Sequence, residues 1–122
     1  MKQQTKQERT SLSHLVTSTC VINDLDALEE ALKTFGGRLL RNQKTFQSYS
    51  AERCAHALDI PGQCQYQIGL RAQGDGSFEL DYDPYDPTLE VVLGKGLAKL
   101  QSAYNVAVVR KQAKAHGWLI KE

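Results

Sequence analysis

The sequence has little cysteine, little net charge and no long hydrophobic run. Its three cysteines (Cys20, Cys54 and Cys64) are an odd number without the paired spacing of a disulfide framework, which favours a cytoplasmic location. Fifteen Lys and Arg against 14 Asp and Glu give a net charge of +1, so no overall field attracts nucleic acid. No apolar run approaches the roughly 20 residues of a membrane helix, and no apolar segment of a secretory signal follows Met1, so we expect no membrane contact.

The first 12 residues are almost entirely polar. We expect them to form a disordered N-terminal arm with a slight basic excess, since Lys2, Lys6 and Arg9 outnumber Glu8. The remaining residues, 13–122, are enough for one domain with a core of its own but too few for two.

The domain begins with a predicted strand and a predicted helix. Residues 13–22 (SHLVTSTCVI) are rich in β-branched side chains, which favour a strand. In residues 23–37, Asn23 or Asp24 can cap a helix, and Gly36-Gly37 can end it. The apolar stripe of this helix consists of Leu25, Leu28, Ala31, Leu32 and Phe35.

Short strands are predicted in the middle of the chain, over residues 38–48, 55–60, 65–72 and 77–82. The last two alternate between apolar and polar side chains and flank Gly74-Asp75-Gly76, which predicts a hairpin. In its second strand, Phe78, Leu80 and Tyr82 share one face, which we expect to lie in the core.

A long helix is predicted after Pro87, which can occupy the first helical position with Asp86 as its cap. Its stripe consists of Leu89, Leu93, Leu97, Leu100, Tyr104 and Val108. Gly94 and Gly96 interrupt the pattern and permit a kink, a break into two helices or a close approach to the sheet. Gly117 ends the helix, and residues 118–122 are predicted to form a last strand.

The predicted order is therefore β-α-β-β-β-β-α-β. Hairpins between two crossing helices indicate an α+β fold, with an antiparallel sheet of about five strands and two helices packed on one face. We expect a ferredoxin-like order that is elaborated in its middle.

Residues 78–87 (FELDYDPYDP) concentrate acidic side chains. Glu79, Asp81 and Asp83 alternate along the strand, so their carboxylates share one face that could bind a partner or a hard cation such as Mg²⁺ or Ca²⁺. The alternative is a solvent-facing strand end, followed by Asp86 as a helix cap.

Other patterns do not meet the spacing that their chemistry requires. Cys54, His56 and Cys64, with Cys20 or His14 as a fourth ligand, lack the second close pair of a structural zinc site. The same residues could form a Cys–His nucleophile pair, but no feature of the sequence indicates which thiol would be activated. The GKG and GDG segments are not phosphate-binding loops. We therefore expect neither a metal ion nor a cofactor.

A basic strip is predicted on one flank of the last helix, formed by Lys95, Lys99, Arg110 and Lys114. Such a strip could bind nucleic acid, or it could be an ordinary solvated helix face.

Several segments, taken in order, resemble the hypothetical chloroplast reading frame 35 family of cyanobacteria and plastids (domain of unknown function 1257). The matching residues are Ser13-His14, DLDAL at 24–28, Ala31, Leu32, Gly36, Tyr66, Ile68-Gly69, FEL-x-x-D at 78–83, Gln101, Tyr104, Val108-Val109, Gln112 and Gly117-Trp118. The likeness covers roughly residues 13–122. The N-terminal arm, Leu15 in place of an aromatic residue and Trp118 in place of Phe are departures from it.

The resemblance implies no established activity, but it implies a small protein that acts together with others. It also singles out His14, Asp83 and Tyr104, which would line one cleft if the ends of the first strand and the hairpin meet.

Three functions stay open from the sequence. The first is a binding or adaptor protein that acts through a protein partner or as a homodimer, by an exposed strand edge or the acidic hairpin. The second is a nucleic-acid-binding module that uses the basic arm and the last helix. The third is an enzyme or metal protein centred on His14 and Asp83.

Overall fold

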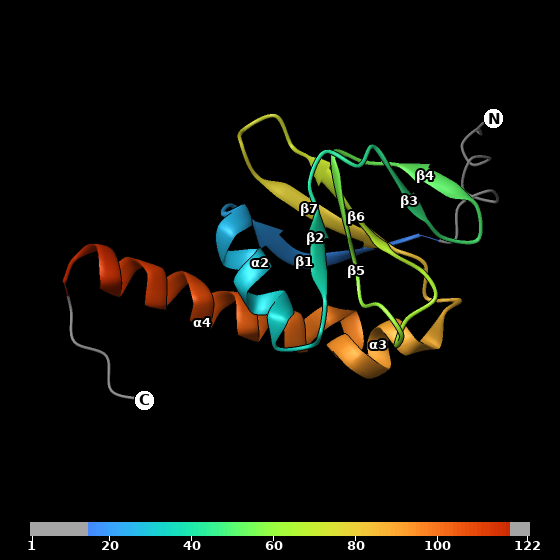
Figure 1. Cartoon of the computed structure of the whole chain (residues 1–122). Helices are drawn as coiled ribbons and strands as arrows, with labels where there is room; N and C mark the ends of the chain where they lie inside the picture. Colours follow the sequence, from blue (N-terminus) through green and yellow to red (C-terminus); the bar gives the residue numbers. More distant parts are fainter. Residues whose placement is uncertain (1–14, 118–122) are drawn as a thin grey trace.

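Within residues 15–117, five antiparallel strands form a central sheet in the order β1-β7-β6-β5-β2 (Figure 1). The computed structural model describes residues 15–117. The sheet consists of β1 (Val16–Ile22), β2 (Arg38–Leu40), β5 (His56–Asp59), β6 (Ile68–Ala72) and β7 (Phe78–Tyr82). A separate two-stranded hairpin consists of β3 (Thr45–Gln47) and β4 (Ala51–Arg53). The predicted class, α+β with an antiparallel sheet of about five strands, is confirmed.

The helical segments are α2 (Leu25–Lys33), α3 (Pro87–Leu93), a 3₁₀ turn η2 (Lys95–Leu97) and α4 (Ala98–Ala115). Six strands, rather than the predicted four, lie between α2 and α3. The extra strands arise because the predicted strand 38–48 turns after Leu40 and continues as β3, which pairs with the unpredicted β4. The predicted arm 1–12, His14 and the predicted strand 118–122 lie outside the described residues.

Helix α2 begins after Asp24, one of its two predicted caps, and ends shortly before the predicted Gly36-Gly37. Asp24 is its cap, with the side chain accepting from the backbone N–H of Ala27 at 3.1 Å. Gly36 has a φ of +74°, and the N–H of Gly37 returns to the carbonyl of Leu32 at 2.8 Å, which ends the helix. Its buried side chains are Ala27, Leu28, Ala31 and Leu32.

The main core lies between the sheet and the helices. Strands β6 and β7 pair as the predicted hairpin, with Leu70 opposite Leu80. Leu80 and Tyr82 are buried in the core cluster and Phe78 packs against it, so the predicted inner face of β7 is confirmed. Side chains from α2, α3 and α4 complete this cluster, among them Leu28, Leu32, Leu89, Leu93, Leu100 and Tyr104.

A second, smaller packing site lies on the other face of the sheet, where the β3–β4 hairpin covers Gly69. Ile68 and Leu70 of β6 point into the main core, so Gly69 between them faces the opposite side. Phe46 of β3 is only 1% exposed and packs directly on this glycine. A Cβ at position 69 would lie 2.3 Å from Cδ1 of Phe46, so only glycine leaves room for the ring.

The predicted long helix is broken at residues 94–97, which is one of the alternatives that Gly94 and Gly96 permit. Gly94, Gly96 and Leu97 all have positive φ, at +89°, +62° and +66°. The left-handed conformation is costly for leucine, but Leu97 is fully buried in the core, which holds it there. Helix α4 therefore starts in a new direction at Ala98.

Hydrogen bonds attach this break to two strands. The hydroxyl of Ser18 in β1 donates to the carbonyl of Gly96 at 2.8 Å. The carboxylate of Glu90 accepts from the backbone N–H of Gly96 at 3.1 Å and from the hydroxyl of Tyr82 in β7 at 2.5 Å. Burial, followed by the bond to Glu90, raises the pKa of Tyr82 to about 12.

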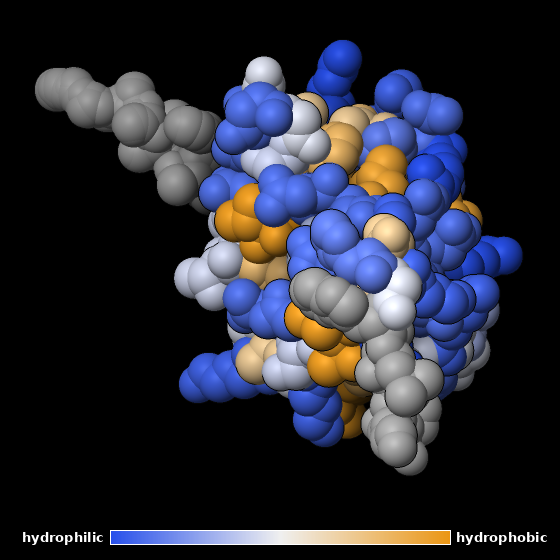
Figure 2. Space-filling model, turned by 90° about the vertical axis from the view of Figure 1, so that its left-hand side faces the viewer, coloured by the Kyte–Doolittle hydropathy of each residue, from blue (hydrophilic) through white to orange (hydrophobic). Residues whose placement is uncertain are grey.

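The surface on the side where α4 ends is mostly hydrophilic (Figure 2). Apolar patches on this face are small and are separated by polar side chains. Val106 and Val109 of α4 are 51% and 59% exposed, as single residues on a charged helix. No helix within residues 15–117 combines the length and the apolar character that crossing a membrane requires.

We predict that Gly69→Ala destabilises the fold by about 1–3 kcal/mol, because the new methyl group displaces the ring of Phe46. Urea unfolding of Gly69→Ala, Phe46→Leu and the double variant measures the coupling between the two positions. The double variant should be more stable than the sum of the single losses implies. Strict additivity would contradict the contact.

We also predict a loss of stability between pH 10 and 12 that depends on Tyr82. The folded state raises the pKa of Tyr82 from 10.0 to about 12, so it holds the proton more tightly than the unfolded chain does. The contribution is complete below pH 10 and falls by roughly 2–3 kcal/mol as the pH rises to 12. Unfolding curves of Tyr82→Phe, which has no proton to lose, should show a correspondingly smaller decline in this window.

Candidate functional site

Asp83, at the end of β7, is a buried carboxylate that connects two loops. It is 1% exposed. Its Oδ1 accepts from the backbone N–H of Tyr85 at 2.9 Å, and its Oδ2 accepts from the backbone N–H of Tyr49 at 3.2 Å. Tyr49 belongs to the turn between β3 and β4, so Asp83 ties that hairpin to the end of the central sheet.

Asp86, three residues later, is a second buried carboxylate that connects separate segments of the chain. As predicted, it caps α3, with Oδ1 accepting from the N–H of Thr88 at 2.9 Å. Its Oδ2 accepts from the backbone N–H groups of Gln65 and Tyr66, at 2.9 and 2.8 Å. Burial acts to raise the pKa of Asp86, but the hydrogen bonds from Thr88, Tyr66 and Gln65 outweigh it and lower the pKa below its usual value.

Three tyrosines gather above these two carboxylates, and we call Tyr49, Tyr66 and Tyr85 the tyrosine cluster. Tyr49 and Tyr85 are 70% and 73% exposed, while Tyr66 packs partly against the core. The rings of Tyr49 and Tyr85 meet edge to face, with centroids 6.2 Å apart. The rings of Tyr66 and Tyr85 are stacked at 6.5 Å, with 25° between their planes.

The tyrosine cluster is fixed through its backbone. Each of its three residues donates its N–H to Asp83 or Asp86, so two carboxylates hold three separate loops together. Large exposed aromatic side chains on a backbone fixed in this way form a preorganised contact surface. This site was not predicted from the sequence, although the polar turn around Tyr49 (QSYSA) and the DPYDP loop each indicate a tyrosine on a surface turn.

Asp83 and Asp86 disfavour a negative charge on the phenol of Tyr66. The pKa of the Tyr66 phenol is raised first by partial burial and then by Asp83, Tyr85, Asp86 and Tyr49. Each of these neighbours disfavours the phenolate anion, and the two aspartates carry the negative charge.

Glu79 and Asp81, the other members of the predicted acidic face, are engaged by one arginine. Asp81 is 8% exposed and accepts from Arg71 Nε at 2.8 Å and from the hydroxyl of Thr17 at 2.7 Å. The same guanidinium binds Glu79 at 3.0 Å. Asp81 is therefore not the solvated strand-end residue that the alternative assumed, and Arg71 neutralises much of the charge on this face.

Tyr104 lies on α4 and is 5% exposed. Its hydroxyl oxygen accepts from the backbone N–H groups of Asn23 and Asp24, at 2.8 and 3.1 Å. These groups precede α2, so Tyr104 anchors the start of one helix to the middle of another.

The structure does not bring Asp83 and Tyr104 together. Tyr104 contacts the end of β1 where Ile22 pairs with Phe78, whereas Asp83 follows the pair of Val16 with Tyr82. The two sites are thus separated by the length of β7, five residues or roughly 15 Å. His14, the third residue of the predicted cleft, lies outside the described residues.

The four residues of the predicted basic strip do not lie on one continuous helix. Lys95 belongs to η2, before the chain turns into α4, whereas Lys99, Arg110 and Lys114 belong to α4 itself. All four are exposed.

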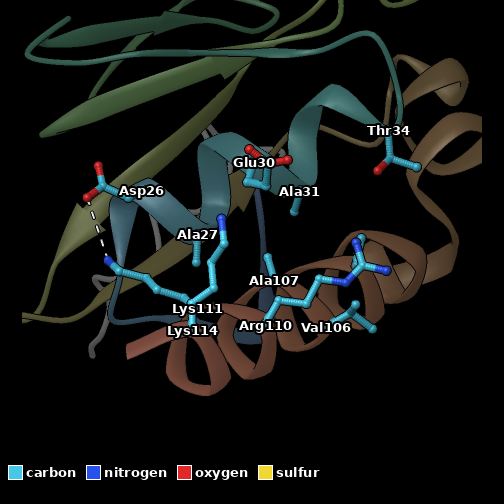
Figure 3. A pocket seen from close by; sticks show the side chains of 11 residues that line it. Asp26, Ala27, Glu30, Ala31, Thr34, Val106, Ala107, Arg110, Lys111 and Lys114 are labelled. Carbon is cyan, nitrogen blue, oxygen red and sulfur yellow. Dashed lines mark ion pairs between the residues drawn. The ribbon is translucent and has the colours of Figure 1, made fainter. Parts of the chain in front are cut away.

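A groove of about 800 Å³ runs between α2 and α4 (Figure 3). Its wall on α4 includes Arg110, Lys111 and Lys114, and its wall on α2 includes Asp26 and Glu30. Lys111 is 2.8 Å from Asp24 and 3.6 Å from Asp26. The groove is therefore mixed in charge rather than basic.

The cysteines and His56 show no sign of activation. Burial is the first cause that raises the pKa of each thiol, to about 11 for Cys20, so none is a ready thiolate. Nδ1 of His56 accepts from the backbone N–H of Asn42 at 2.8 Å, and burial, Lys44 and Arg41 lower its pKa. Within residues 15–117, no group of three or more His, Cys, Asp and Glu side chains could hold a metal ion.

Comparison with known proteins adds no relative. No protein-family model, no curated protein and no solved structure matches the chain.

We predict that Asp86 contributes much more to stability than the corresponding cap of α2. Asp86→Ser keeps an acceptor for Thr88 but removes the second oxygen, so two loop N–H groups lose their partner, at a cost of about 2–4 kcal/mol. Asp24→Ser is the matched control, because serine also caps a helix and the lost pair with Lys111 is largely exposed. Its cost should stay below about 1 kcal/mol.

Urea unfolding at several pH values checks both costs. The folded state lowers the pKa of Asp86, so its contribution is complete above the usual pKa of 3.8 and is lost as the pH falls below it. The difference between the unaltered chain and Asp86→Ser should therefore shrink in acid. Equal losses for the two serine variants at pH 7 would refute the bridging role of Asp86.

Proposed function

We propose that the chain is a small binding module that holds a protein partner on the tyrosine cluster. The observation that carries this proposal is the pair of highly exposed rings, Tyr49 and Tyr85, on loops that Asp83 fixes from below. Tyrosine is enriched where proteins bind one another, since it offers a large contact area for few rotatable bonds. A backbone that is already fixed reduces the entropy that binding must cost.

The two surfaces predicted from the sequence for such a partner receive less support. In the described part of the chain the edge strands are β1 and β2. β2 has three residues, and the pairing of β1 shifts between Thr17 and Val21, so neither presents a long regular edge for an added strand. The acidic hairpin is largely neutralised by Arg71. The tyrosine cluster is therefore the better contact surface.

The alternative functions stay predictions. Nucleic-acid binding would need the basic residues of α4, but these face Asp26 and Glu30 across the groove. An enzyme centred on His14 and Asp83 would need a reactive carboxylate, and both oxygens of Asp83 already accept backbone N–H groups.

Several other expectations also stay predictions. They are the cytoplasmic location, the homodimer and the family resemblance. The ferredoxin-like order is another, because its last strand, 118–122, falls outside the described residues.

A pull-down with matched variants tests the proposal. The bait is the unaltered chain, the double variant Tyr49→Ala/Tyr85→Ala, or Val91→Ala, which removes an equally exposed apolar side chain from α3. A protein recovered by the unaltered chain and by Val91→Ala should be reduced about tenfold or more with the double variant, as expected for two interface aromatics. Circular dichroism verifies that all three baits are folded.

Two outcomes would overturn the proposed function. The first is that the unaltered chain recovers no specific protein from a lysate of its own source. The second is that all three baits recover the same protein equally well, which would place the contact elsewhere on the molecule.

A further inference from the structure

We propose that the tyrosine cluster accepts an arginine side chain of the protein partner. This inference rests on the proposed function and adds the chemical class of the group that is bound. It follows from three features of the site, namely the orientation of the rings, the sign of the buried charge and the way in which that charge is held.

The rings offer aromatic faces in two directions. Tyr66 and Tyr85 are nearly parallel, with 25° between their planes, whereas Tyr49 stands at 80° to Tyr85. The face of an aromatic ring is the negative side of its quadrupole and attracts a cation within about 6 Å. A planar guanidinium can stack on one of these faces while its edge meets another ring.

The charge beneath the rings is negative. Asp83 and Asp86 are 1% and 7% exposed, and they carry the charges that act on the Tyr66 phenol. Burial in a medium of low polarity strengthens the action of such charges over several ångströms. An anionic ligand, such as a phosphate or an acidic peptide, would be repelled by this field, and a neutral ligand would gain nothing from it.

The carboxylates of Asp83 and Asp86 are not available to form an ion pair with the arginine directly. Their oxygens accept five hydrogen bonds from backbone N–H groups, two at Asp83 and three at Asp86. They therefore favour a cation through their field, while the rings supply the contact. This combination suits arginine better than lysine, since guanidinium is planar, is more weakly hydrated and stacks on aromatic faces.

Defined peptides test the ligand class directly. The probe is an octapeptide of alternating glycine and arginine, and its control is the same peptide with citrulline, the neutral isostere of arginine. A third peptide carries lysine in place of arginine. Binding is followed by NMR through the ring resonances of Tyr49, Tyr66 and Tyr85 in 50 mM salt.

We expect the arginine peptide to bind about tenfold or more tightly than the citrulline peptide, with the lysine peptide between them. Tyr85→Phe keeps the ring and should bind within about threefold of the unaltered chain, whereas Tyr85→Ala should lose about tenfold. Val91→Ala, which lies outside the cluster, should change nothing. Raising the salt to 0.5 M should weaken binding of the arginine peptide and leave the citrulline peptide unaffected.

Equal affinity for the arginine and citrulline peptides would overturn the inference, and so would unchanged binding to Tyr85→Ala. These results are distinguishable from failure of the proposed function. A partner that is captured through Tyr49 and Tyr85 while the arginine peptide does not bind shows that the ligand class is wrong. An arginine peptide that binds while no protein partner is captured refutes the protein-binding role instead.

Discussion

Two aspartates three residues apart, Asp83 and Asp86, accept hydrogen bonds from backbone N–H groups of three loops. The position of the tyrosine cluster depends on these bonds. Asp83 binds the turn between β3 and β4 as well as its own loop, and Asp86 binds the segment before β6 as well as the start of α3. These bonds lie at one end of the sheet, where the chain crosses between elements and the ladder of strand pairing has ended. A buried carboxylate without such donors would lower the stability of the fold considerably. The loops and the carboxylates therefore hold each other in place.

The β3–β4 hairpin shows why this arrangement is cooperative. The hairpin has few strand pairs of its own, and other contacts hold it in place: Phe46 packs on Gly69, Gln47 exchanges two hydrogen bonds with Gln67, and Tyr49 donates to Asp83. The contact with Gly69 is apolar and lies on the face of the sheet away from the main core, whereas the other contacts are polar. Because Gly69 and Asp83 belong to the paired strands β6 and β7 and the loop that follows, the position of Tyr49 is set by the most regular part of the fold.

The sequence allowed the local elements to be predicted but not the long-range contacts. The cap Asp86, the Gly36 terminus and the β6–β7 hairpin depend on side chains near in sequence and were predicted correctly, and Asp24 was one of two predicted caps of α2. The break before α4 was only one of three alternatives, because it depends on whether the core can hold Leu97 in a left-handed conformation. Strand β4 was missed because its three residues, Ala51–Arg53, have no apolar alternation.

The candidate site was the hardest part to predict, for a related reason. Tyr49, Tyr66 and Tyr85 are separated by 17 and 19 positions, and only the sheet topology brings them together. From the sequence, Asp83 was predicted to line a cleft together with His14 and Tyr104, as an acidic residue with a chemical role of its own. Its burial and its two backbone partners give it a positioning role, and Tyr104 has a similar role at the other end of the sheet.

The acidic stretch at residues 78–87 therefore presents little of its charge directly to solvent. Arg71 forms ion pairs with Glu79 and Asp81, and backbone N–H groups donate to Asp83 and Asp86. The difference between these two pairs matters, because a guanidinium cancels a negative charge whereas amide dipoles only stabilise it. A negative field from Asp83 and Asp86 consequently acts at the tyrosine cluster. A surface that combines aromatic faces with this field selects for cations, and it does so without a carboxylate that a partner could touch.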